Sequence, residues 1–193
     1  YSDKEEAAYV CKNILRIHRA EGCDYGDFAI LYRTNSQSRT FEEEMRKQNI
    51  PYRIFGGMSF YQRKEIKDVI AYFRLVVNHH DEEAFRRIIN YPARGIGDTT
   101  VNKIVAGAQE RNVSLWTVAQ NPLAYGVEIN KGTINKLSLF CQMIEGFSQR
   151  LNTDDVYELG KDIIKMSGIT ADIYSGTNAD DTSRQENLEE LVN

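Results

Sequence analysis

The chain has 193 residues, of which 41% are hydrophobic and 27% charged, which suits one or two globular domains with a core. No apolar run approaches the roughly 20 residues of a membrane-spanning helix, so we expect no membrane partner. The net charge of −4 argues against nucleic acid, yet residues 33–103 carry thirteen basic and nine acidic side chains, a net +4. Because local field matters more than the total, a nucleic-acid partner stays possible there.

The three cysteines, Cys11, Cys23 and Cys141, are far apart and form no Cys-x-x-Cys pair. This spacing argues against a disulfide framework and a cysteine zinc site, and it is typical of a reducing cytoplasm. The histidines lack ligand spacing with any cysteine or carboxylate, so we expect no metal site.

The first 55 residues alternate between helical and strand-like patterns. A helix is predicted over residues 3–20, with Ser2 or Asp3 as its cap. Residues 28–32 form a short apolar run typical of a buried strand, a helix then runs to about residue 48, and residues 52–55 read as a second strand. This order predicts a βαβ unit with a parallel crossover. Two strands are too few for a stable sheet, so we expect an exposed apolar edge that pairs with a second copy.

After Gly56 and Gly57 the pattern becomes helical throughout. Helices are predicted over residues 64–78, 81–89, 99–111, 114–120, 133–150, 154–167 and 182–192. The fold class is therefore mainly α: a partial α/β piece over residues 1–55, followed by an all-helical domain over residues 56–193. Tyr1 is not a methionine and the last helix ends on an apolar spacing, so both ends look cut from something longer.

The segment between two of these helices, residues 91–100, contains a Gly-Ile-Gly turn that suits a phosphate backbone. Gly95 and Gly97 lack a Cβ, so the main chain can approach a phosphate closely. Asp98 or Thr99 can cap the next helix, whose free N–H groups favour an anion, and Arg94 adds a fork-shaped cation. An ordinary helix–loop–helix turn explains the same residues equally well.

A second polar cluster follows the first predicted strand, where ligands bind in open α/β sheets. Arg33, Thr34, Asn35 and Arg39 suit a phosphate-bearing ligand. The alternative is helix capping with a surface ion pair from Arg39 to Glu42 or Glu43.

Residues 60–68 add a third candidate. Arg63 and Lys67 lie one helical turn apart and form either a basic ridge or a solvated face, and Phe60 and Tyr61 either stack on bases or pack at a domain junction. No P-loop is present, because Gly160-Lys161 is followed by Asp162 inside a helical pattern. The chain therefore shows no self-contained active site.

Five ordered motifs resemble the UvrD/PcrA/Rep group of superfamily 1 DNA helicases. They run over residues 29–39 (AILYRTNSQSR), 50–57 (IPYRIFGG), 60–68 (FYQRKEIKD), 92–97 (PARGIG) and 186–191 (ENLEEL). The resemblance implies a 3′-to-5′ motor that uses ATP and Mg²⁺ and serves DNA repair or replication restart in the bacterial cytoplasm, associated with the nucleoid. Residues 1–55 would begin its second RecA-like motor domain, 2A, and residues 56–193 its helical accessory domain, 2B. The motor machinery lies outside this chain, so we expect the chain alone to hold no cofactor and to be inactive.

The resemblance also implies site residues. The single strand would meet Arg33, Thr34, Asn35 and Arg39 on 2A. The duplex would meet the loop of Arg94, Gly95, Ile96, Gly97, Asp98, Thr99 and Thr100. The 2A–2B junction would contain Gly56, Gly57, Arg63, Lys64 and Asp68. The partners implied are single-stranded and duplex DNA and the remaining motor domains of the same chain.

Two other functions stay open at this point. The first is a stand-alone DNA-binding module without sequence preference. The second is a helical scaffold for protein partners that is indifferent to DNA.

Overall fold

The computed structural model describes residues 2–32, 37–55, 59–176 and 179–192, and these residues are almost entirely helices and loops. The described chain divides into two compact units. The first unit contains residues 1–66 and 186–191, and the second contains residues 67–185 with the last two residues.

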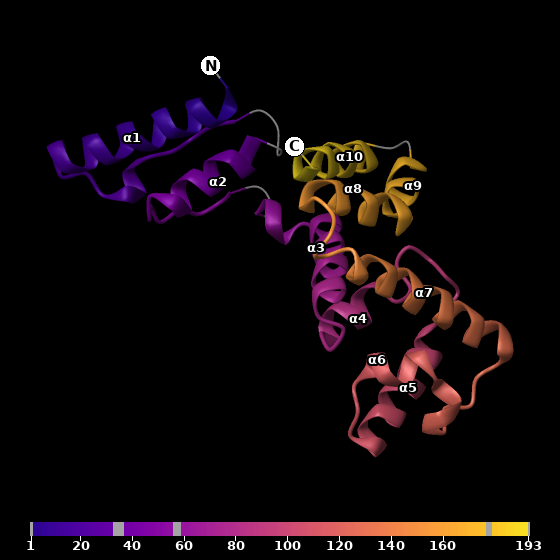
Figure 1. The fold of residues 1–193 in the computed structure, drawn as a ribbon. Helices are drawn as coiled ribbons and strands as arrows, with labels where there is room; N and C mark the ends of the chain where they lie inside the picture. The colour runs from indigo at the N-terminus through magenta and orange to yellow at the C-terminus, as the bar shows by residue number, and fades with distance from the viewer. Residues whose placement is uncertain (1, 33–36, 56–58, 177–178, 193) are drawn as a thin grey trace. The chain divides into compact units, whose positions relative to one another are not determined.

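In the first unit, helix α1 (Asp3–Glu21) packs beside α2 (Ser38–Lys47), as Figure 1 shows. The α1 helix begins at a capping box in which Ser2 and Glu5 satisfy each other's backbone amides, and it ends where Gly22 adopts φ +71°. This unit also contains two short 3-10 turns, η1 (Tyr25–Asp27) and η3 (Phe60–Gln62), and the ends of α3 and α10.

A buried carboxylate organises the middle of this unit. The Glu42 side chain is 3% exposed and accepts hydrogen bonds from the Phe60 amide at 3.0 Å and the Tyr52 hydroxyl at 3.2 Å. The guanidinium of Arg46 supplies a countercharge at 3.3 Å. Burial of this charge is tolerated because its oxygens have donors.

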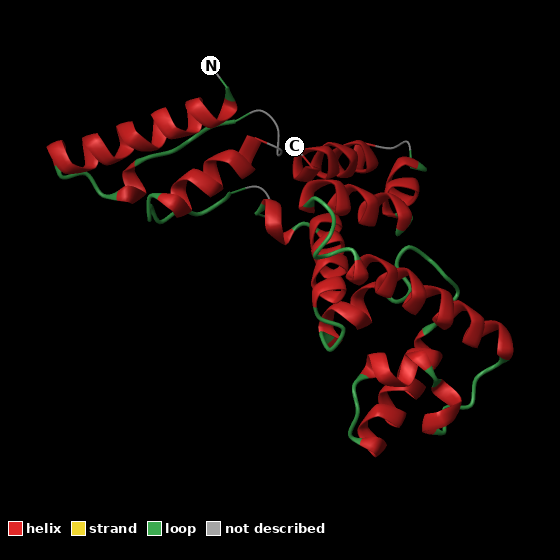
Figure 2. Cartoon of the chain, viewed as in Figure 1, coloured by secondary structure: helices red, strands yellow, loops and turns green. Residues whose placement is uncertain are grey.

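The expected βαβ piece is wrong for the described residues, which form no strand (Figure 2). Residues 28–32 and 52–55 are loops, with Leu31 94% exposed and Phe55 82% exposed. An extended segment becomes a strand only when a neighbour completes its hydrogen-bond ladder, and two segments alone supply too little. The sheet edge expected to pair with a second copy is therefore also absent from the described residues.

The second unit is built from helices joined by short loops. Its elements are α3 (Lys64–Val77), which begins in the first unit, α4 (Glu82–Ile88), α5 (Asp98–Arg111), α6 (Leu115–Gln120), η4 (Pro122–Tyr125), α7 (Lys131–Gln149), α8 (Val156–Met166), α9 (Ile169–Tyr174) and α10 (Ala179–Val192), of which residues 186–191 belong to the first unit. The predicted helices are confirmed within about three residues at each end, and α9 was not predicted.

An aromatic cluster fills the core of this unit. The rings of Phe85 on α4, Trp116 on α6 and Phe140 on α7 lie 6.0 to 6.5 Å apart, and His79 stacks on Trp116 at 4.4 Å. These rings bring α4 and the loop before it together with α6 and α7. No helix in the described part of the chain is both long and apolar enough to cross a membrane.

Candidate nucleic-acid interface

The Gly-Ile-Gly loop connects α4 to α5, and one side chain fixes its shape. The Oδ1 atom of Asn90 accepts the backbone amides of Arg94 at 2.9 Å and Ile96 at 3.0 Å. Gly95 sits at φ +70°, a conformation that favours glycine. Ile96 is fully buried and anchors the loop to the unit.

The other side of this loop faces solvent. Gly95, Gly97, Asp98 and Thr99 are exposed, while Thr100 is half-buried. The amides of Gly97, Asp98 and Thr99 have no acceptor among the residues that the structure describes, whereas the Thr100 amide bonds to the Gly97 carbonyl at 2.9 Å. A short row of free N–H groups at a helix start is a place where an anion is favoured.

The helix cap differs from the sequence prediction. Gly97 is the N-cap of α5, with φ −76° and ψ 168°, and Asp98 is the first helical residue. The N-cap is the residue with an extended backbone whose carbonyl accepts the first helical bond, and Gly97 meets both conditions. The expectation that Asp98 or Thr99 would cap is wrong, and this helix start has no side-chain cap.

Arg94 points into the unit. Its Nη1 donates to the carbonyls of Ile88 at 3.2 Å and Pro92 at 3.0 Å, and its Nη2 donates to the Tyr72 hydroxyl at 2.6 Å and the Ser167 carbonyl at 2.8 Å. Both terminal nitrogens are therefore engaged within the fold. The sequence suggested that this guanidinium binds a phosphate, but in the structure it donates to backbone carbonyl oxygens.

One lysine of α7 contacts this loop, and one lysine of α5 contacts the segment before α7. The Nζ atom of Lys136 on α7 donates to the Gly95 carbonyl at 3.3 Å, and the Nζ atom of Lys103 on α5 donates to the Glu128 carbonyl at 2.8 Å. Neither lysine forms an ion pair with a described residue. Neither contact could be predicted from the sequence, because the partners lie 41 residues apart for Lys136 and 25 residues apart for Lys103, and no local pattern signals such contacts.

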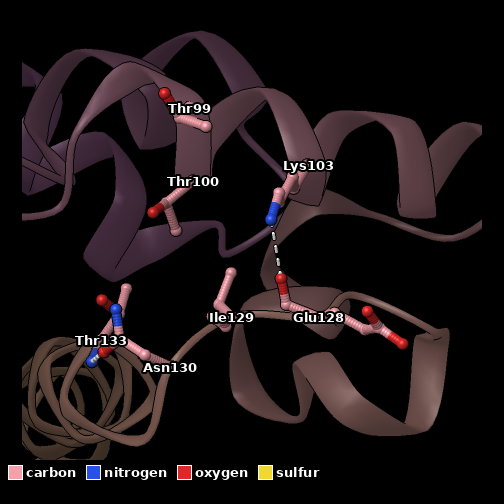
Figure 3. Close-up of a pocket in the computed structure, with 7 residues that line it drawn as sticks. All are labelled: Thr99, Thr100, Lys103, Glu128, Ile129, Asn130 and Thr133. Carbon is pink, nitrogen blue, oxygen red and sulfur yellow. Dashed lines mark hydrogen bonds between the residues drawn. The ribbon is translucent and has the colours of Figure 1, made fainter.

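A groove of about 410 Å³ opens beside this helix start (Figure 3). The first turns of α5 and α7 and the segment before α7 line it, through Thr99, Thr100, Lys103, Glu128, Ile129, Asn130 and Thr133. In Figure 3, the Glu128 backbone carbonyl faces Lys103 while its carboxylate points away. The groove is therefore lined by hydroxyls, an amide and a cation.

The cluster predicted after the first strand is only partly described. Arg33, Thr34 and Asn35 lie outside the described residues. Arg39 is described, and its Nε lies 2.8 Å from Glu43 Oε1, with Glu190 at 3.7 Å from Nη1. This geometry is the helix ion pair that the sequence left open as an alternative.

Two of the three described residues among the predicted junction residues are buried. Gly56 and Gly57 lie outside the described residues, and Lys64 is exposed. Arg63 is 8% exposed and donates to Asn187 and Ser38. Burial lowers the pKa of its guanidinium. In the second unit, Asp68 is 3% exposed and pairs with Arg87 at 2.7 Å.

Of the two neighbouring aromatic residues, only Phe60 is too deeply buried for base stacking. Phe60 is fully buried, and the half-buried Tyr61 donates its hydroxyl to Glu43 at 2.7 Å. Packing, the alternative left open for both, is what the structure shows for Phe60, whereas Tyr61 keeps part of its surface exposed. Among the described residues, no group of three or more histidines, cysteines or carboxylates is placed to hold a metal ion.

Comparison with known proteins identifies relatives along the whole chain. The family described as UvrD-like helicase C-terminal domain matches residues 1–193. Two "ATP-dependent DNA helicase PcrA" proteins are similar, from Staphylococcus epidermidis strain ATCC 35984 at 36% identity and from Staphylococcus aureus strain Mu50 at 33%. Each alignment covers 99% of this chain but only 26% of the relative. The chain thus spans about a quarter of the length of the curated relatives it matches.

Proposed function

We propose that this chain, which belongs to the family of UvrD-like helicase C-terminal domains, is a DNA-binding portion of an ATP-dependent DNA helicase. Relatives named for that activity align with it over nearly its full length. The helicase would move 3′ to 5′ in repair or replication restart. ATP and Mg²⁺ would be used by parts of the protein outside these 193 residues, because no phosphate-binding Gly-x-x-x-x-Gly-Lys-Ser/Thr occurs here.

The same proposal assigns the domains. Residues 1–55 would belong to motor domain 2A and residues 56–193 to accessory domain 2B, with Arg63, Lys64 and Asp68 near their junction. Single-stranded DNA would meet Arg33, Thr34 and Asn35. Arg39 would act indirectly by stiffening α2 through Glu43. Partners would be DNA and the remaining motor domains.

The observation that carries the duplex-binding part is the solvent-facing side of the Gly-Ile-Gly loop. Three successive amides, those of Gly97, Asp98 and Thr99, have no acceptor among the described residues at a helix start without a side-chain cap. Backbone amides bind phosphate without reading bases. The loop therefore suits a motor that must grip any sequence.

The test is duplex binding by the Gly97→Val variant. Gly97 has an ordinary φ, and nothing lies within 4 Å of the position its Cβ would take, so the side chain fits while it blocks approach to the amides. We expect duplex binding to weaken by about 1–3 kcal/mol for every sequence tested, measured by fluorescence anisotropy.

The matched control is Gly146→Val on α7, where a Cβ also meets nothing within 4 Å. This variant should bind as the parent chain does. If the Gly97→Val variant keeps its helical circular dichroism and binds duplex as tightly as the parent chain, the loop only connects α4 to α5 and does not bind DNA. A wild-type chain that shows no salt-dependent duplex binding would favour a protein scaffold instead.

A further inference from the structure

We propose that Tyr91 is a positioning residue for the Gly-Ile-Gly loop, fixing the loop to α9 through the carboxylate of Asp172 and to α10 through the guanidinium of Arg184. This inference rests on the proposed function, because the position of the loop matters here only if the loop binds DNA. It goes beyond that function by assigning the shape of the binding surface to side chains that do not themselves touch the nucleic acid.

The backbone of Tyr91 is fixed from inside the second unit. The hydroxyl of Tyr72 on α3 donates to the Tyr91 carbonyl at 2.6 Å, and the same hydroxyl accepts a hydrogen bond from Nη2 of Arg94 at 2.6 Å. Tyr72 is fully buried, and burial raises the pKa of its hydroxyl to about 12, so it remains a donor at neutral pH. One buried tyrosine therefore links two residues of the segment that precedes Gly95.

The side chain of Tyr91 is fixed by two helices that come much later in the chain. Its hydroxyl donates to Oδ2 of Asp172 on α9 at 2.9 Å and accepts from Nη2 of Arg184 on α10 at 3.1 Å, across 81 and 93 residues of sequence. Burial and the hydrogen bond to the Asp172 carboxylate raise the pKa of the Tyr91 hydroxyl, so it stays protonated at neutral pH and can donate. Tyr91 is thus held both at its carbonyl and at its hydroxyl.

The contacts of Arg184 favour a role in placing Tyr91 over a role as a strong ion pair. Its Nη2 lies 3.8 Å from Asp172 and its Nη1 lies 3.4 Å from Asp181. Both distances exceed the roughly 2.7–2.9 Å of strong charge-assisted hydrogen bonds. Its Nε is buried and has no hydrogen-bond partner in the described part of the chain. The Tyr91 hydroxyl is therefore the shortest polar contact of this guanidinium with a described residue.

Tyr91 stands at the start of the segment that ends in the row of free amides, residues 97–99. Between them, the Asn90 side chain accepts the amides of Arg94 and Ile96. Without the Tyr91 hydroxyl, the start of this segment would lose its ties to α9 and α10, and the three free amides would converge for only part of the time. The apparent affinity of a binding site falls in proportion to the fraction of molecules in the binding shape.

The test compares Tyr91→Phe with Tyr61→Phe in the 193-residue chain. Both tyrosines are half-buried and donate to a carboxylate, at 2.9 Å and 2.7 Å, so each variant loses one comparable hydrogen bond. Hydrogen exchange of the Arg94 and Ile96 amides, measured by NMR without DNA, should become roughly tenfold faster in Tyr91→Phe, as expected when one hydrogen bond to a charged group is lost locally. Exchange at these amides should not change in Tyr61→Phe.

Duplex affinity gives the second measurement on the same variants. The Kd from fluorescence anisotropy should rise roughly fivefold for Tyr91→Phe. The salt dependence of binding should stay as it is, because the substitution removes no cation. Tyr61→Phe should bind duplex as the parent chain does. A substitution that only destabilised the fold would leave the affinity of the folded molecules unchanged, so the two roles are separated.

Asp172 allows the same bond to be tested from α9. Its side chain is 39% exposed, so substitutions there are compatible with folding. Asp172→Asn keeps an oxygen that can accept the Tyr91 hydroxyl, and this variant should retain the exchange rates and the affinity of the parent chain. Asp172→Ala removes the acceptor and should reproduce the behaviour of Tyr91→Phe.

Three results would overturn the positioning role while the proposed function survives, provided that the parent chain binds duplex. They are unchanged duplex affinity in Tyr91→Phe, unchanged exchange of the two loop amides in that variant, and equal behaviour of Asp172→Asn and Asp172→Ala. If the parent chain binds no duplex at all, the proposed function itself fails, and the positioning role fails with it.

Discussion

At the scale of single residues, Arg94 was predicted to contact a phosphate, whereas its side chain forms hydrogen bonds inside the second unit. Its guanidinium donates four hydrogen bonds, three of them to the backbone carbonyls of Ile88, Pro92 and Ser167. It also lies over the rings of Tyr72 and Phe140, at 5.8 and 5.5 Å from their centres. These contacts make Arg94 a brace for the loop.

We therefore predict that Arg94→Ala lowers the free energy of unfolding of the chain by about 2–3 kcal/mol, because acceptors inside the unit lose a charged donor. Urea denaturation gives this value. The control Arg86→Ala removes an exposed arginine from α4 and should change stability by less than about 0.5 kcal/mol. If the two variants were equally stable, Arg94 would not be a brace.

His79 gives a second prediction at this scale. Burial lowers the pKa of its imidazole below the ordinary 6.5, with a smaller contribution from His80, while the charge of Glu145 opposes the shift. The ring stacks on Trp116 and lies 2.8 Å from the hydroxyl of Ser148. Between the lowered pKa and 6.5, the unfolded chain binds more protons than the folded chain.

The stabilising effect of neutral His79 is thus complete above pH 6.5 and is lost as the pH falls through the lowered pKa. Urea midpoints measured from pH 8 to pH 5 should fall along this range for the parent chain. The His79→Gln variant should flatten the curve, whereas His80→Gln, at the exposed neighbour, should keep most of it. An unchanged curve for His79→Gln would assign the pH dependence to other groups.

At the scale of elements, helices follow their own local signals and strands do not. The α1 helix begins at the capping residue that the sequence marks, and Asp81 caps α4 through the Ala84 amide at 3.0 Å. These signals lie within one turn of each other, so they could be read directly. Residues 28–32 have the composition of a strand, but their structure depends on partners that no local pattern specifies.

At this scale, we predict that the shape of the loop before α5 depends on Asn90. Asn90→Ala removes the acceptor of two backbone amides, so we expect a loss of about 1–2 kcal/mol in stability and weaker duplex binding. Asn90→Asp keeps the acceptor and should keep the stability, while its added negative charge still weakens binding to phosphate. If Asn90→Ala matched the parent chain in both assays, the loop would hold its shape without this clamp.

At the scale of the whole molecule, the sequence located the Gly-Ile-Gly loop but not the lysine that folding brings to it. Gly95 and Gly97 stand in a local motif that can be read, and the local excess of basic residues pointed to the same segment. Lys136 belongs to a segment of the chain that is net acidic, and only the tertiary fold brings it to Gly95. Charge counted along a sequence misses cations that folding collects from elsewhere.

The last prediction concerns the chain as an isolated protein. In the proposed function, these residues bind DNA phosphates, and other parts of the protein hydrolyse ATP, since this sequence has no P-loop. The 193-residue chain should therefore bind duplex with a steep dependence on salt and release no phosphate from ATP above background, with or without DNA. A phosphate-release assay beside the anisotropy titration measures both. DNA-stimulated hydrolysis that persists in repurified chain would mean that these residues form a nucleotide site of their own.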